Sequence, residues 1–217
     1  MVGKDVKLIE YSRGVDTLNY LTHGFGAVMG LVGALLLIIK AEGFRQIFAV
    51  AVYGLALVTV YSVSTVYHCL KNGEAKRIAR IVDHSAIPLL IAGTATPCAL
   101  ISLFEVSKPH GVIVFCFAWT CTIFGLFSKI FFFEKLKAFT MGVYITCCSL
   151  MLIVAVPLLG KIDTGDFALI LVGCVFYLLG AVLCRLGSKN EKIHPIFHVV
   201  VLIGSAFHYY VILNMVI

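Results

Sequence analysis

Apolar stretches long enough to cross a membrane make up most of this chain. Each approaches the roughly 20 residues that a helix needs to span about 30 Å of hydrocarbon. Hydrophobic residues form 61% of the 217 residues and charged residues only 13%, about half the charged share of a soluble domain. The sequence therefore predicts an all-α integral membrane protein, a single domain (1–217) of seven transmembrane helices, with spans at about 19–39, 44–68, 81–103, 111–128, 139–159, 167–184 and 196–217.

The distribution of basic residues predicts which way this bundle faces. Short connectors make sequential helices antiparallel, so the N-terminal tail (1–17) shares one side with every second connector. All but four of the 17 Lys and Arg residues fall on that side; the exceptions are Lys40, Arg45, Lys108 and Lys161. Because cytoplasmic loops retain Lys and Arg, we expect a cytoplasmic N-terminus and an external C-terminus. A basic rim beside anionic lipid explains the net charge of +6 without a nucleic-acid partner.

Five polar residues lie at the ends of these apolar stretches, where burial is costly. Ser64 and His68 close the second span, Asp83 opens the third, and His194 and His198 open the last. The predicted topology places all five at the cytoplasmic ends of their helices. The spacing of four puts each pair on one helix face. Imidazole and carboxylate groups are metal ligands, so we expect a metal site here, with a metal-free hydrogen-bond network as the alternative.

Two further features bear on the geometry of that site. Proline disfavours helical geometry in the residue before it, so Pro195 is expected to leave His194 at a helix cap, with the histidine pair splayed. Asp16, Asn19 and His23 form a polar stripe on the first span. The stripe either faces the site or consists of a helix-start cap and packing residues.

Three imidazoles around zinc leave a fourth position open, as in catalytic sites. Asp83 could then bind the metal or activate a water, and Ser64 could donate a hydrogen bond to either. Such a site beneath the lipid headgroups favours metal-assisted hydrolysis of a lipid carbonyl.

The same residues resemble the motifs of the hemolysin III family, the bacterial branch of the progestin and adipoQ receptor group that includes the adiponectin receptors. The first motif is Asp16-Thr-Leu-Asn19-Tyr-Leu-Thr22-His23-Gly24, with Asp16 where Glu is usual. The others are Ser64-Thr-Val-Tyr67-His68, Asp83-His84-Ser-Ala-Ile with Ala92-Gly93-Thr94-Ala-Thr96-Pro97, and His194-Pro-Ile-Phe-His198.

The resemblance implies a seven-helix bundle with a cytoplasmic N-terminus, in a bacterial inner membrane. It also implies zinc held by His68, His194 and His198, with Ser64 and Asp83 lining the site. Three functions stay open: a ceramidase-like hydrolase of a lipid amide or ester, a membrane sensor with structural zinc, and a cytolysin. The expected partner is a membrane lipid, ceramide or another acyl lipid. A dedicated pore is disfavoured because no span carries a continuous polar face. The sequence leaves the oligomeric state open.

Overall fold

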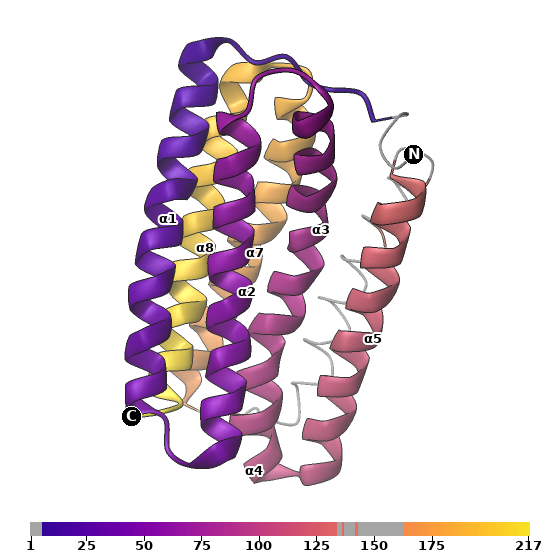
Figure 1. The fold of residues 1–217 in the computed structure, drawn as a ribbon. Helices are drawn as coiled ribbons and strands as arrows, with labels where there is room; N and C mark the ends of the chain where they lie inside the picture. The colour runs from indigo at the N-terminus through magenta and orange to yellow at the C-terminus, as the bar shows by residue number, and fades with distance from the viewer. Residues whose placement is uncertain (1–5, 134–135, 137–141, 143–162) are drawn as a thin grey trace.

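The computed structural model of the protein describes residues 6–133, 136, 142 and 163–217. Across these residues the regular structure is entirely helical (Figure 1). The elements are α1 (Arg13–Lys40), α2 (Gly43–Cys69), α3 (Glu74–Pro97), the π-helix η1 (Cys98–Leu103), α4 (Phe104–Val106), α5 (Lys108–Phe132), α7 (Thr164–Gly187), the 3-10 helix η3 (Glu191–Ile193) and α8 (His194–Asn214).

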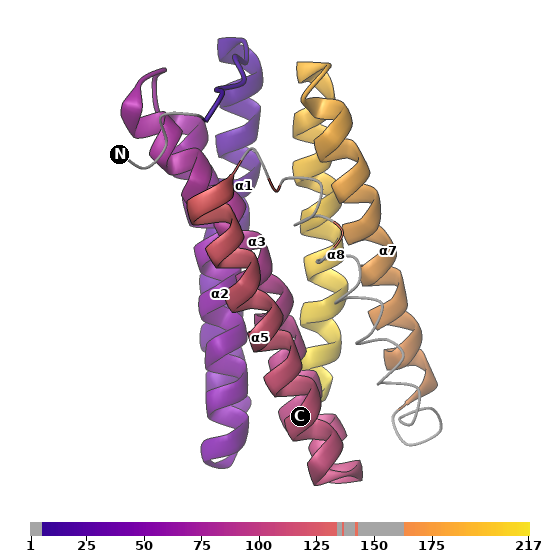
Figure 2. The same cartoon turned by 90° about the vertical axis from the view of Figure 1, so that its right-hand side faces the viewer.

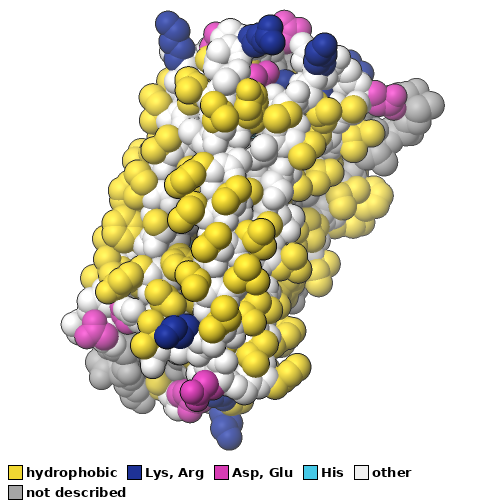
Figure 3. Space-filling view, turned by 60° about the vertical axis from the view of Figure 1, so that its left-hand side comes forward, with side chains coloured by type: hydrophobic (Ala, Val, Ile, Leu, Met, Phe, Trp, Pro, Cys, Tyr) yellow, Lys and Arg dark blue, Asp and Glu magenta, His cyan; other side chains and the backbone are white. Residues whose placement is uncertain are grey.

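Six helical segments of the described chain are long and apolar enough to cross a membrane, counting α3, η1 and α4 as one. Large apolar side chains point outward along their length, among them Phe25, Leu55 and Val175. In Figure 3 such side chains cover the middle of the visible face, and Lys, Arg, Asp and Glu gather at its two ends. This distribution is that of an integral membrane protein. The fifth expected span, 139–159, lies outside the described residues except for Gly142.

The long helices stand side by side along one axis. Helices α1, α3 and α8 run in one direction, and α2, α5 and α7 run in the other (Figures 1 and 2). Neighbours pack in the order α5, α3, α2, α1, α8 and α7. The start of α1, the end of α2 and the starts of α3 and α8 therefore lie at the same end of the bundle, which we call the N-terminal end.

Two helices begin earlier than the apolar spans. Helix α1 starts at Arg13 instead of residue 19, and α3 starts at Glu74 instead of residue 81. Hydropathy marks where a helix enters hydrocarbon, whereas the helix itself continues through the polar boundary as long as its backbone groups remain paired. Lys76 and Arg80, expected in a connector, thus lie on the first turns of α3.

Small residues let neighbouring helices approach closely. A Cβ atom built on Gly54 of α2 would lie 2.5 Å from the Cβ of Ala34 on α1, and one on Gly93 of α3 would lie 2.5 Å from the Cβ of Ala56 on α2. Close approach of this kind is how helices associate in lipid, where the hydrophobic effect between helices is weak. The tight turn between α1 and α2 uses the positive φ of +68° at Gly43, which glycine adopts without steric cost.

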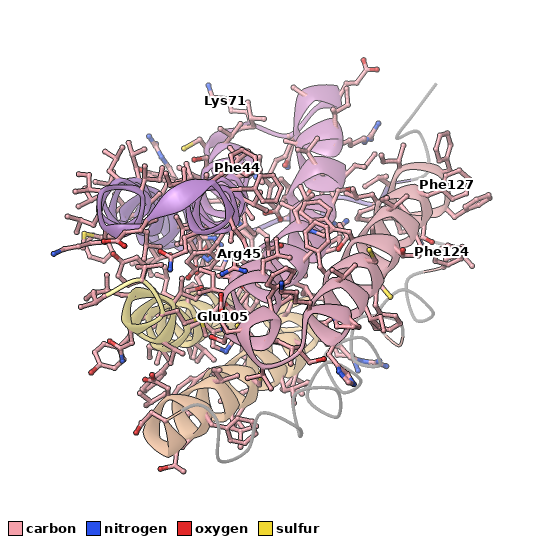
Figure 4. The ribbon with its side chains drawn as sticks, turned by 90° about the horizontal axis from the view of Figure 1, so that it is seen from below. Phe44, Arg45, Lys71, Glu105, Phe124 and Phe127 are labelled. Atoms are coloured by element: carbon pink, nitrogen blue, oxygen red, sulfur yellow. The ribbon has the colours of Figure 1, made fainter. Side chains whose placement is uncertain are left out.

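Polar contacts connect the helices in the interior and at the far end of the bundle. In the interior, Tyr61 of α2 and Tyr177 of α7 each share a hydrogen bond with the hydroxyl of Ser205 on α8. At the end opposite the N-terminal end, Arg45 at the start of α2 forms an ion pair with Glu105 of α4 (Figure 4). These contacts join helices that are distant in sequence.

Candidate metal centre

Three histidines converge at the N-terminal end of the bundle. His68 lies in the last turn of α2, and His194 and His198 lie in the first turns of α8. One ring nitrogen from each lies within 4.8 Å of the other two. Their residues are only 2%, 8% and 1% exposed. This spacing fits three nitrogens around one ion, because a metal–nitrogen bond of about 2.0–2.1 Å puts tetrahedral ligands some 3.3 Å apart and small side-chain movements close the difference.

The expected effect of Pro195 on this pair is not seen. His194 has helical geometry, with φ −63° and ψ −42°, and is the first residue of α8. Proline is tolerated in the first turn of a helix, where its missing N–H has no intrahelical partner in any case. The short helix η3 directly precedes α8, so the backbone is already helical at His194. The ring centroids of His194 and His198 lie 4.9 Å apart. The pair is not splayed.

Hydrogen bonds fix which nitrogens of two histidines are free. His68 Nδ1 lies 2.9 Å from Asp16 Oδ1, and His198 Nδ1 lies 3.2 Å from the carbonyl oxygen of Asn19. A carboxylate and a carbonyl only accept, so Nδ1 carries the proton in both rings and Nε2 keeps its lone pair. Both Nε2 atoms, and Nδ1 of His194, are buried with no hydrogen-bond partner in the described part of the chain. Unpaired buried nitrogens of this kind fit a metal ligand set.

The polar stripe of α1 lies against these histidines. Asp16 accepts the hydrogen bond from His68 and also one from Lys76 Nζ of α3 at 3.0 Å. The side-chain amide of Asn19 lies 3.3 Å from His68 Nδ1, and the ring of His23 stacks on that of His198 with centroids 3.6 Å apart. A carboxylate hydrogen-bonded to the far nitrogen of a metal-binding histidine orients the ring and raises its basicity. Helix α1 thus orients candidate metal ligands that come from α2 and α8.

Ser64 lies next to this cluster, and Asp83 contacts Ser64. Ser64 is buried one turn before His68 on α2, and its hydroxyl faces the carboxylate of Asp83 on α3. Asp83 does not join the three histidines in the group of mutually close ligand atoms found among the described residues. Asp83 is therefore not a member of this candidate ligand set.

Two residues of the site were not expected from the sequence. The ring of Tyr11 lies 5.5 Å from that of His68 and 4.9 Å from that of His194, and burial raises the pKa of its hydroxyl well above the ordinary value. Lys76 is 2% exposed. Lys76 lies seven residues before Asp83, which is two helical turns on the same helix face, so the sequence offered a reason to expect Lys76 near the site. Tyr11 precedes the first span, and the sequence offered no such reason for it.

The remaining histidines lie elsewhere. His208 is buried further along α8, where its Nε2 lies 3.1 Å from the carbonyl oxygen of Ile170 on α7. His110 lies at the start of α5, hydrogen-bonded to the Ser107 hydroxyl. His84 contacts the ring of Phe133. None of the three belongs to the group of close ligand atoms in the described residues.

Comparisons with known proteins agree on one family. The family model described as "Haemolysin-III related" matches residues 11–209. "Hemolysin-3" of Bacillus cereus is 36% identical over 91% of this chain and 90% of its own length. "Hemolysin-3 homolog" of Bacillus subtilis (strain 168) is 31% identical over 91% and 92%.

A more distant relative is human "Monocyte to macrophage differentiation factor", 25% identical over 89% of this chain and 81% of its own length. It is a member of the progestin and adipoQ receptor group. The comparison with solved structures gave no significant match.

Proposed function

The chain belongs to the haemolysin-III related family of membrane proteins, and we propose that it binds one zinc ion through His68, His194 and His198. One observation carries the proposal: two of these rings donate from Nδ1 to acceptors on α1, which leaves their buried Nε2 lone pairs without a partner. Neutral imidazole nitrogens are preferred zinc ligands. A hydrogen-bond network without metal would leave three buried nitrogens unpaired, at a cost of about 1–3 kcal/mol each.

We further propose that the site hydrolyses an amide or ester bond of a membrane lipid such as ceramide. Bound zinc would supply the Lewis acid that polarises the carbonyl. Asp83 contacts Ser64, which lies one turn before His68 on α2, and its carboxylate would take a proton from an attacking water and return it to the leaving group. Ser64 would orient that carboxylate through its hydroxyl. Because the cluster is buried, its substrate would have to reach it from the lipid side.

The proposal includes the topology. With seven spans, the N-terminal end would face the cytoplasm and the C-terminus would lie outside the inner membrane of a bacterium. The distribution of Lys and Arg supports this orientation. The common direction of α5 and α7 (Figure 1) is the arrangement that one further crossing between them requires.

A second function rests on a different observation. The cluster joins α2 to α8, which are neighbours of α1 on opposite sides in the packing order. An ion there would clamp the two helices across α1 and serve a structural role in a membrane sensor. The hydrolase accounts better for Asp83, a carboxylate that the clamp does not use.

Metal analysis and lipid hydrolysis together test the proposal. The purified protein should contain close to one zinc per chain, and His68→Ala and His194→Ala should lose it. His110→Ala, which alters a histidine outside the cluster, should retain it. Asp83→Asn should keep zinc and lose hydrolysis of ceramide. Wild-type protein without metal would refute the site, and a zinc-loaded wild type that cleaves no acyl lipid would favour the clamp.

A further inference from the structure

The residues just before α1 form a short non-helical segment that is held at both of its ends. This segment, residues 6–12, crosses the N-terminal end of the bundle to reach α1 (Figure 1). At its first residue, the buried side chain of Val6 packs against Ile81 of α3. At its last residue, the backbone N–H of Ser12 donates a hydrogen bond of 2.6 Å to the carboxylate of Glu191 in η3. We call residues 6–12 the N-terminal strap.

The strap places an aromatic ring directly on the histidine cluster. The centroid of the Tyr11 ring lies 5.5 Å from that of His68 and 4.9 Å from that of His194. Tyr11 lies two residues before α1, whereas Asp16, which reaches His68 from below, lies in the first turn of that helix. The Tyr11 ring therefore lies between the cluster and the polar end of the bundle, and it bridges α2 and α8.

The strap can leave the cluster without unfolding a helix. Residues 6–12 have no regular secondary structure, and the hydrogen bond between Ser12 and Glu191 is exposed to water. Segments with few backbone hydrogen bonds and exposed contacts open locally at low free energy, while the helices around them stay folded. The contacts of Val6, Tyr11 and Ser12 thus hold a cover that is able to open.

We propose that the N-terminal strap closes the histidine cluster against the aqueous phase, and that its opening sets the rate at which a metal ion enters and leaves. The second half of this proposal rests on the zinc site proposed above, and the first half does not. A metal ion has to arrive from water, because moving an ion into hydrocarbon is very costly. A lipid substrate would arrive from the bilayer, so the ion and the substrate would use different routes.

The kinetics of zinc exchange in the purified full-length protein test the second half. Release of bound zinc to an excess of chromophoric chelator, and uptake of zinc by chelator-treated protein, are followed by stopped flow. Tyr11→Ala should speed up both by about tenfold or more, because it removes the ring that covers the cluster. Glu191→Ala should speed up both by about two- to tenfold, because it removes the acceptor for Ser12. A gate changes both rates by the same factor, so Kd should stay unchanged.

Two control variants separate the cover from its chemistry. Tyr11→Phe keeps the ring, and Glu10→Ala removes an exposed charge of the strap without removing an anchor; both should exchange zinc like the wild type. Equal exchange rates in Tyr11→Ala, Glu191→Ala and the wild type would overturn the gate. So would faster release with unchanged uptake, because Tyr11 would then hold the ion in place instead of controlling access to it.

Chemical modification of histidine tests the closure without any metal. Chelator-treated protein in detergent is reacted with diethyl pyrocarbonate, and the modified residues are identified by mass spectrometry. His194 should react slowly in the wild type, and faster in Tyr11→Ala and Glu191→Ala by about the same factors as zinc exchange. His110, which is exposed at the opposite end of the bundle, should react at one rate in all three proteins.

The comparison of His194 with His110 within the wild type needs no variant, so it holds even if a substitution prevents folding. Wild-type His194 that reacts as fast as His110 would overturn the closure. Folded variants whose His194 reacts no faster than in the wild type would overturn it as well. A wild type without zinc would refute the zinc site, and the modification rates would still decide whether the strap covers the histidines.

Discussion

The carboxylate of Asp16 on α1 accepts a hydrogen bond from Nδ1 of His68 on α2, across 2.9 Å. The same carboxylate accepts one from Lys76 on α3. One acidic side chain therefore connects three helices and fixes the protonation of a proposed zinc ligand. The relationship gives the first prediction.

Replacing Asp16 with Asn should weaken zinc binding without abolishing it. The amide removes the negative charge that raises the basicity of the His68 ring, and such changes typically cost 10–100-fold in metal affinity. Competition with a chromophoric chelator measures the affinity. Glu74→Gln, which neutralises an exposed acidic residue at the same end of the bundle, should leave the affinity unchanged. Equal affinities in Asp16→Asn and the wild type would refute the role of Asp16.

Zinc should stabilise the folded protein. An ion that binds only the folded state adds about 2.7 kcal/mol when its free concentration is 100 times the dissociation constant. Thermal unfolding of chelator-treated protein, with and without added zinc, should show a rise in Tm for the wild type. His198→Ala should show little or no rise. A rise of the same size in His198→Ala would mean that zinc acts at another site.

Gly54→Ala should destabilise the bundle by about 1–3 kcal/mol, because its new Cβ would meet the Cβ of Ala34 at 2.5 Å and force α1 and α2 apart. Gly14→Ala is the control, since nothing lies within 4 Å of a Cβ atom built there, and it should be neutral or slightly stabilising. Both can be compared by thermal unfolding. Unchanged stability of Gly54→Ala would show that the two helices separate at little cost.

Ser205→Ala should also destabilise the protein, by about 1–3 kcal/mol, because it leaves the buried hydroxyls of Tyr61 and Tyr177 without this partner. Adding Tyr61→Phe and Tyr177→Phe to the same chain removes those hydroxyls and should recover most of the loss. Failure of this triple variant to recover would show that Ser205 acts through packing.

The predicted orientation can be tested with reporters at the C-terminus. An alkaline phosphatase fused after Ile217 should be active, because this enzyme folds in an oxidising compartment and seven spans from a cytoplasmic N-terminus place that end outside. A green fluorescent protein at the same position should be dark. The opposite pair of results would contradict either the orientation or the number of spans.

Much of the site was predictable because it depends on helix periodicity. His68 follows Ser64 by four residues and His198 follows His194 by four, so the sequence places each pair on one face. The short connectors then bring the ends of α2, α3 and α8 together. The stripe of Asp16, Asn19 and His23 was visible, although nothing in the sequence chose between a capping role and contact with the histidines.

Other features depend on three-dimensional contacts that a periodic pattern does not encode. The cap expected at His194 was wrong, because the geometry of η3 outweighs the local preference of a residue before proline. Lys76 and Arg80 were counted as connector charges, because hydropathy cannot show that α3 continues beyond the hydrocarbon boundary. Tyr11 reaches the histidines from a segment without helical periodicity, next to Ser12, whose backbone N–H donates a hydrogen bond to Glu191.

The order in which the chain is synthesised determines when the histidine cluster becomes complete. His68 leaves the ribosome with the second span, but His194 and His198 come with the last. A chain that is still being synthesised, or one truncated before α8, presents only one of the three nitrogens. Capture of the ion would therefore report that the final helix has been inserted, and a chain that stops early could not acquire it.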